Sequence, residues 1–151
     1  MFYAWPGRST GEPMAKPSLT DQEYALLAQF RSRLRRFLHW SEQRIRAAGL
    51  TPSQYLLLLG IRADRSGRGP TIGEMAEFLQ LRHHTVVELA DRAEAAGLMR
   101  RNPDADDGRV VRLALTGSGR QRLERLAAMN LQELSRLDLI TRALDTVRDE
   151  S

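Results

Sequence analysis

The sequence contains no cysteine and a single lysine, Lys16, among its 151 residues. Without cysteine the chain cannot form disulfide bonds, sense redox state through thiols or build a cysteine-based zinc site. No apolar run approaches the roughly 20 residues of a membrane-spanning helix, and residues 1–18 lack the long apolar core of a secretory signal. We therefore expect a cytoplasmic protein that has no contact with the membrane.

Signatures of enzymes are also missing. The sequence shows no spacing typical of a nucleophile and its base, no glycine-rich phosphate loop after a strand and no cluster of metal ligands. We therefore expect neither an enzyme nor a bound cofactor. The function classes that remain are binding functions, with nucleic acid or protein as the partner.

The composition is that of a soluble globular domain, with 42% hydrophobic and 28% charged residues. The 23 basic residues exceed the 19 acidic ones, and the net charge of +4 is compatible with nucleic acid binding without establishing it. Nearly all the basic residues are arginine, which suits two-pronged contacts with phosphates and bases. A coding bias would produce the same composition.

The N-terminal part of the chain predicts a tail followed by a long helix. Residues 1–18 hold three prolines and no periodic pattern, which is typical of a flexible tail. The helix is predicted over residues 20–48, where Thr20 and Glu23 form a capping box. Its apolar residues fall in two stripes, which predicts two burial partners, its own lobe and a second chain. The stripes are Tyr24, Leu27, Leu34, Leu38, Ser41 and Ile45, and Leu26, Phe30 and Phe37.

The centre of the chain predicts three helices and two strands. A second helix begins at Thr51 and Pro52, and its apolar string 55–61 indicates burial on most sides. Helices over 73–79 and 82–96, joined by a turn at Gln80 and Leu81, form a helix-turn-helix. Strands over 98–101 and 110–115 flank a polar tip at 102–108. The predicted fold is mainly α with a small β-hairpin wing, a winged helix-turn-helix with N- and C-terminal dimerisation helices.

The C-terminal part predicts another long amphipathic helix. Thr116 caps it, its leucine stripe runs through residues 120–148, and its periodicity breaks near 136–139. A helix of this kind standing alone would expose the stripe, so we expect it to pair. The predicted organisation is a tail at 1–18, dimerisation helices at 19–50 and 117–151, and a DNA-binding lobe at 51–116.

Residues 71–119 resemble the MarR family of bacterial transcription regulators, and the resemblance extends more weakly into both flanking helical regions. The matching residues are Val86, Leu89, Asp91-Arg92 and Gly97-Leu98 in the helix-turn-helix, Asp107-Gly108-Arg109 in the wing, and Leu113, Thr116 and Gly119 after it. The resemblance implies a homodimer that binds pseudo-palindromic double-stranded DNA. It also implies repression, with release of DNA when a small aromatic or phenolic effector binds between the DNA-binding lobe and the dimerisation helices.

The predicted DNA contacts lie on the helix at 82–96 and on the wing. The N–H groups of a helix N-terminus favour phosphate, and histidine and threonine can bond base edges. Val87 suits a thymine methyl group and Glu88 a cytosine amino group, although relatives often carry a basic or polar residue in place of Glu88. The predicted set is Arg82, His83, His84, Thr85, Val87, Glu88, Arg92, Arg101 and Arg109. Each could instead be a solvated surface residue.

Arg109 has two predicted roles in the wing. It can enter a narrow minor groove, or it can hold the wing in place by pairing with Asp107 or with Asp91. The resemblance implies the pair with Asp91. Relatives often carry a second arginine in place of Gly108, so this wing is expected to grip the minor groove less strongly.

The charge count of the lobe is unusual for a DNA-binding surface. Residues 71–115 contain six arginines and eight acidic residues, a net charge of −2, whereas residues 19–70 contain nine and four. We expect Glu74, Glu94 and Asp104 to face away from DNA, and non-specific affinity to be modest and salt-sensitive. The alternative function is a helical interaction module whose winged helix binds a protein partner.

Two further sites were considered. Neighbouring histidines on a helix project about 100° apart, which makes His83 and His84 poor chelators, so no metal site is expected. An effector pocket is predicted at His39, Trp40, Arg44 and Tyr55, which offer rings to stack and a cation for a carboxylate or phenolate. Packing in the core or an interface is the favoured alternative for Trp40 and Tyr55.

Overall fold

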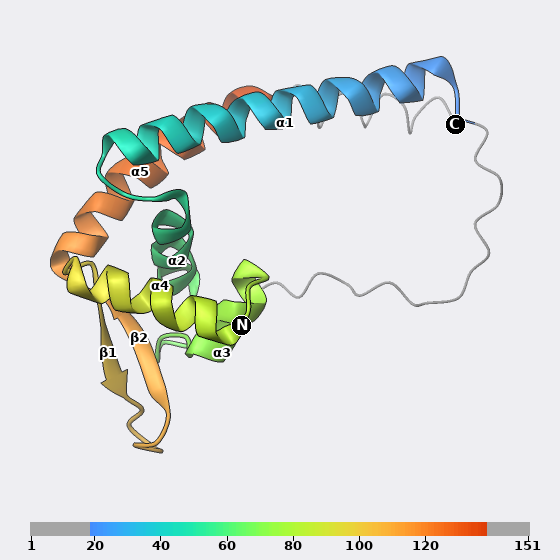
Figure 1. Cartoon of the computed structure of the whole chain (residues 1–151). Helices are drawn as coiled ribbons and strands as arrows, with labels where there is room; N and C mark the ends of the chain where they lie inside the picture. Colours follow the sequence, from blue (N-terminus) through green and yellow to red (C-terminus); the bar gives the residue numbers. More distant parts are fainter. Residues whose placement is uncertain (1–18, 139–151) are drawn as a thin grey trace, which may run out of the picture. The chain divides into compact units, whose positions relative to one another are not determined.

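The computed structural model describes residues 19–138 of the chain. Its elements are α1 (Asp21–Ala47), α2 (Pro52–Ala63), α3 (Ile72–Leu79), α4 (His83–Ala95), β1 (Met99–Pro103), β2 (Val111–Leu115), α5 (Gly117–Ser135) and a 3₁₀ turn at Arg136–Asp138. The hairpin of β1 and β2 projects from the end of the lobe beyond α4 (Figure 1). The prediction of a mainly helical winged helix-turn-helix is confirmed.

Threonines begin most of these helices, as local chemistry dictates. Thr20 accepts a hydrogen bond from the backbone N–H of Glu23, whose carboxylate accepts one from the N–H of Thr20, so the predicted capping box is confirmed. Thr116 accepts a hydrogen bond from the N–H of Gly119. The same reciprocal box joins Thr51 to Gln54 and Thr71 to Glu74. A cap of this kind stabilises a helix by about 1 kcal/mol.

The described residues form two compact units. Residues 42–128 make one unit, called here the lobe, and residues 19–41 with 129–138 make the other, called here the arm. The boundaries fall within α1 and α5, so the lobe includes the end of α1 and the start of α5. The predicted tail at 1–18 and the predicted helix beyond residue 138 lie outside the described residues.

The core of the lobe is built from the apolar faces of α2 to α5 and the hairpin. Val86, Leu89, Ala90 and Ala93 of α4 are buried, which confirms the stripe expected from their spacing. Met75 of α3 is fully buried. The α2 helix contributes Tyr55, Leu57, Leu58 and Ile61. The prediction that this helix is buried on most sides is confirmed, and Leu56 is its exposed leucine.

A residue in the left-handed conformation joins α3 to α4. Gln80 has a φ of 54°, and its backbone N–H donates to the carbonyls of Ala76 and Glu77. The N–H of Leu81 also donates to Ala76, over 3.0 Å. These bonds satisfy the last carbonyls of α3 and reverse the chain within two residues, which confirms the predicted turn of the helix-turn-helix.

The hairpin is longer than predicted on its first strand. The strands pair antiparallel, with Met99 opposite Leu115 and Pro103 opposite Val111. The sequence predicted that the strand ends at Arg101, because Asn102 and Pro103 are typical turn residues. Proline is tolerated here because it occupies the last position of a strand in a two-stranded sheet.

The end of α5 and the arm contain two further features. The predicted break near 136–139 is present as the 3₁₀ turn at Arg136–Asp138. Within the arm, the hydroxyl of Ser41 donates to the side-chain oxygen of Asn130, and both residues are buried. Ser41 was counted in an apolar stripe, and the hydrogen bond to Asn130 explains how a hydroxyl occupies that position. No helix within residues 19–138 has the length and apolarity needed to cross a membrane.

The start of α5 packs against the backbone that leads into β1. The N–H of Thr116 donates to the carbonyl of Leu98 over 3.1 Å, and a Cβ atom on Gly119 would lie 1.8 Å from the same oxygen. Gly119 is therefore the residue that permits this close approach.

We predict that Gly119→Ala lowers the free energy of unfolding by at least ~1–3 kcal/mol, since the added methyl group must push two backbones apart. Gly117→Ala is the matched control, because nothing lies within 4 Å of a Cβ at Gly117. Urea denaturation of both variants measures the difference. Equal stability of the two variants would show that the close approach has no structural role.

Candidate nucleic-acid interface

The N-terminal turn of α4 is open to solvent. Arg82 occupies the N-cap position, and no side chain makes a capping hydrogen bond there, unlike at α2 and α3. Arg82, His83 and His84 are exposed, and Thr85 is half-buried. Backbone N–H groups at an uncapped helix start are suited to donate hydrogen bonds to the oxygens of a phosphate.

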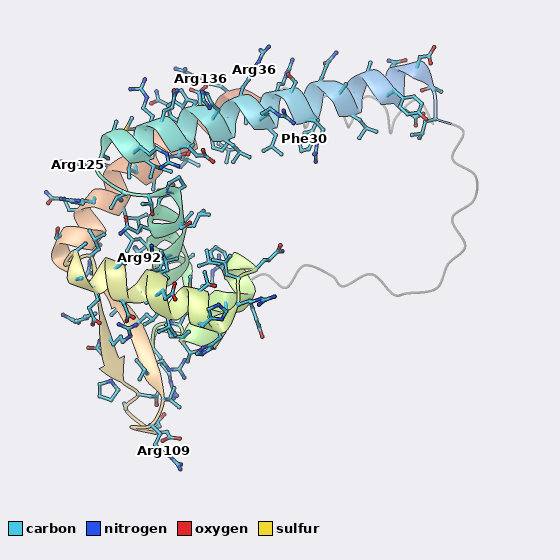
Figure 2. The ribbon with its side chains drawn as sticks, viewed as in Figure 1. Phe30, Arg36, Arg92, Arg109, Arg125 and Arg136 are labelled. Atoms are coloured by element: carbon cyan, nitrogen blue, oxygen red, sulfur yellow. The ribbon has the colours of Figure 1, made fainter. Side chains whose placement is uncertain are left out.

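The outward face of α4 carries the remaining predicted contact residues of this helix. Glu88 and Arg92 are exposed, and Val87 is half-buried. Figure 2 shows Arg92 on the ribbon of α4. The structure therefore brings Arg82, His83, His84, Glu88 and Arg92 to the solvent-exposed side of one helix, as a groove-binding helix requires.

Arg101, a predicted DNA contact, is instead bonded to α4. Its Nη2 lies 2.6 Å from Oδ1 of Asp91, and its Nη1 contacts Oε2 of Glu94 at 2.5 Å. Nη2 also donates to the carbonyl of Val87. Partial burial lowers the pKa of Arg101, but the hydrogen bonds to Glu94 and Asp91 raise it above its ordinary value. The guanidinium is only 24% exposed, so Arg101 joins β1 to α4 and has few N–H groups left for a phosphate.

Arg109 lies at the tip of the wing. Figure 2 shows its side chain pointing away from the rest of the lobe, and the side chain is 93% exposed. Its Nε donates to Oδ1 of Asp107, which also accepts the backbone N–H of Arg109. The pair with Asp107 was one of the predicted alternatives. The pair with Asp91 is wrong here, because Asp91 is bound by Arg101, whose strand lies directly beside α4.

A second arginine, Arg112, joins the wing to α3, a contact that the sequence pattern does not predict. Its Nε donates to Oδ2 of the buried Asp104 over 2.8 Å. Its Nη1 donates to the carbonyl of Gly69 and to Oε2 of Glu74. The sequence indicates that Asp104 is a turn residue whose carboxylate accepts nearby N–H groups. It does not indicate that Arg112 on the opposite strand is its partner.

Asp104 is the most heavily bonded carboxylate of the wing. Its Oδ1 accepts the N–H groups of Asp106 and Asp107, while Oδ2 accepts from Arg112. The hydrogen bond from Arg112 and the two backbone hydrogen bonds lower the pKa of Asp104 from 3.8 to about 2. Asp104 therefore stays ionised through the physiological range and organises the tip around its charge.

These ion pairs neutralise most of the negative charge counted in residues 71–115. Six of the eight acidic residues in 71–115 are ion-paired within the described residues. Glu74, Glu94 and Asp104 were expected to face away from DNA; their charges are instead neutralised by Arg112 and Arg101. Arg82 at the start of α4, and Glu88 and Arg92 further along it, are exposed and form no ion pair with a described residue. Arg109 at the wing tip is exposed and paired with Asp107.

The remaining predictions concern a metal site and an effector pocket. No group of three or more histidine, cysteine or acidic side chains suited to a metal ion occurs among residues 19–138. Trp40 stacks on Phe37, with ring centroids 6.4 Å apart. Tyr55 is buried in the core of the lobe, where burial raises its pKa. His39 and Arg44 are exposed, so the effector role of these four residues stays a prediction.

Comparison with known proteins finds one family model and related regulators. Residues 48–110 match the model of the MarR family. The chain is 31% identical over 80 residues to the HTH-type transcriptional repressor MdtR of Bacillus subtilis (strain 168). That alignment covers 53% of this chain and 50% of MdtR, so the chain matches about half the length of this curated relative.

Solved structures share the fold at lower sequence identity. The chain is similar to MepR, a transcription regulator of the Staphylococcus aureus multidrug efflux pump MepA, with a TM-score of 0.70 and 22% identity over 84% of this chain and 97% of MepR. It is also similar to MepR in a complex with DNA, with a TM-score of 0.63 and 24% identity over 73% of this chain and 78% of that chain.

Asp104 makes the stability of the lobe depend on pH. Because its pKa is lower in the folded state than its ordinary 3.8, its contribution is fully present above that value and is lost as the pH falls through about 2. We predict that Asp104→Asn is less stable than the wild type at pH 7 and loses less stability between pH 4 and pH 2. Asp106→Asn, which changes an exposed carboxylate, is the control. Thermal melts across this range measure both; parallel curves for wild type and Asp104→Asn would contradict the assignment.

Proposed function

Because residues 48–110 match the model of the MarR family, we propose that the chain is a member of that family, a sequence-specific DNA-binding transcription regulator and not an enzyme. The observation that supports the proposal most directly is the uncapped, solvent-exposed N-terminal turn of α4, followed by a wing with an exposed arginine at its tip. A helix start of this kind presents N–H groups and side chains together to a DNA groove. MepR, whose fold the chain shares, is known in a complex with DNA.

Each predicted contact has a role that fits its position. His83, His84 and Thr85 at the start of α4 are suited to read base edges in the major groove. Arg82 and Arg92 are exposed cations suited to phosphates. Arg109 at the wing tip is suited to the minor groove. We assign Arg101 a positioning role, since it holds the wing against α4.

Glu88 is expected to influence which bases α4 prefers, and its negative charge is expected to oppose binding close to a phosphate. Its carboxylate is exposed on the outward face of α4, and the described structure pairs it with no cation. Close to a phosphate this charge would be repelled, whereas a cytosine amino group would be a favourable partner. With Val87 beside it, Glu88 would therefore favour a site that presents a cytosine and a thymine methyl group in the major groove.

We further propose that the protein acts as a homodimer formed through the arm. The arm exposes an apolar surface that a single chain leaves uncovered among the described residues. Its members are Leu19, Tyr24, Leu27, Phe30, Leu38, Met129, Leu131 and Leu134. Exposed apolar patches of this extent mark association surfaces, and a two-fold dimer would place two copies of α4 on a pseudo-palindromic site.

Repression with release by a small effector is the regulatory mode that we propose. Its support is that the chain is 31% identical over 80 residues to MdtR, a transcriptional repressor. An aromatic or phenolic effector recognised by His39, Trp40, Arg44 and Tyr55 would be the releasing ligand. The proposal of DNA binding does not depend on this mode.

The DNA-reading role of α4 can be tested on a site selected from random-sequence oligonucleotides by the full chain. We predict that His83→Ala and Thr85→Ala each cost about 1–3 kcal/mol of binding free energy on that site and relax its sequence preference. Arg125→Ala, an exposed change on α5 (Figure 2), is the control and leaves binding unchanged. Fluorescence anisotropy measures the affinities. A folded dimer that binds no DNA at low salt would overturn the function and favour a protein partner.

The dimer can be tested by placing a charge on the arm. Leu27 is 53% exposed and Leu131 is 68% exposed. We predict that Leu27→Asp and Leu131→Asp sediment as monomers, whereas the wild type sediments at about twice the 17.1 kDa chain mass. Leu56→Asp is the control, because Leu56 is an exposed leucine of the lobe. Dimeric arm variants, or a monomeric wild type, would exclude this interface.

A further inference from the structure

An open groove of about 460 Å³ lies on the lobe and shares no residue with the predicted DNA contacts. Its walls come from the end of α2, the loop at 64–70, the hairpin and the start of α5. Four arginines line it, and the acidic residue among its lining residues is Asp64. The arginines are Arg62, Arg68, Arg100 and Arg120.

Three of these arginines are without an ion pair among residues 19–138. Arg62, Arg100 and Arg120 are exposed and form no ion pair with another described residue. Arg68 pairs with Asp106, with Nη2 and Oδ2 2.7 Å apart, and its side chain is still 56% exposed. In the rest of the lobe Arg101 and Arg112 are neutralised by carboxylates. Like charges gathered in one hollow repel one another, and a bound anion relieves that repulsion.

We propose that this groove binds a small anion that carries at least two phosphate or carboxylate groups. Guanidinium groups recognise such groups through paired, charge-assisted hydrogen bonds. The arginines approach from four different segments around one hollow volume, which suits a compact ligand with several charges. The volume lies within the range of small-molecule sites.

The backbone of DNA is a weaker fit to the same charges. A duplex presents its phosphates along an extended ridge, with one charge per ~1.7 Å of helix axis, and is best matched by a convex or flat row of cations. Residues 113–115 of β2 also line the groove. The four arginines come from four different segments that line one hollow, so they do not form a row along a single element.

The groove is also built into the wing by main-chain bonds. The N–H of Leu113 donates to the carbonyl of Pro70 over 2.8 Å, and Arg112 donates to the carbonyl of Gly69. These bonds hold the loop at 64–70 against β2. The position of the loop that carries Arg68 is therefore set by the fold of the lobe and does not require a ligand.

The test uses the whole chain without DNA, so it is independent of the proposed function. Inorganic pyrophosphate and citrate are titrated into the protein by calorimetry at constant ionic strength, because screening alone would otherwise change the heat. We expect saturable binding of at least one of the two anions. Arg100→Ala with Arg120→Ala should weaken it by about tenfold or more, since two charge-assisted bonds are removed.

A double variant with the same loss of charge elsewhere is the control. Arg46→Ala with Arg125→Ala changes two exposed arginines outside the groove and should bind as the wild type does. Amide chemical shifts locate the site in the wild type, with changes expected around residues 62–69, 100, 113–115 and 120. Folding of each variant is checked by its circular dichroism spectrum; should the first double variant not fold, Arg62→Ala replaces it.

Three outcomes would overturn the proposal. The first is that neither anion binds at millimolar concentration. The second is that both double variants weaken binding equally, which would show a general charge effect. The third is that the groove variant lowers DNA affinity and its salt dependence while neither free anion binds, which would make the groove a contact for the DNA backbone.

Discussion

Two arginines on the strands of the wing fix the geometry of the lobe. Arg101 on β1 bonds Asp91 and Glu94 of α4, while Arg112 on β2 bonds Asp104 at the tip and Glu74 of α3. Isolated surface ion pairs contribute little to stability, but these pairs share partly buried guanidinium groups and carry several hydrogen bonds each. The wing is thereby tied to both helices of the helix-turn-helix, so that α4 and the wing tip present a single surface.

The same pairs decide which charges reach a partner. Residues 71–115 contain more acidic than basic residues, yet most of these carboxylates form ion pairs with arginines within the lobe. The unpaired charges of α4, those of Arg82, Glu88 and Arg92, then contribute most to the local field, because charges paired in contact nearly cancel at a distance. The cations left over on the other side of the hairpin line the anion groove. The distribution of carboxylates thus separates the surface that we propose for DNA from the groove that we propose for a small anion.

Local chemistry made much of the fold predictable. The capping box of Thr20, the stripe on α4 and the break at 136–138 follow from contacts within a few residues of one another. The predictions that were wrong concern pairs formed across elements. Arg101 and Arg109 are both possible partners of Asp91 in the sequence. The ion pair forms with Arg101 because β1 lies beside α4 in the folded lobe. The convergence of Arg62, Arg68, Arg100 and Arg120 on one groove is likewise invisible in the sequence, because they come from distant segments.

The central claim is that the two arginines make α4 and the wing one DNA-reading surface. The chain has no cysteine, so Ala105→Cys at the exposed wing tip can carry an iron-chelate cleavage probe at a single place. On a selected DNA site, we expect two sharp sets of cuts, symmetric about its centre, that spread over neighbouring base pairs once Arg101→Met is added. Sharp cuts that do not change with Arg101→Met, or no cuts on DNA that the protein binds, would contradict the claim.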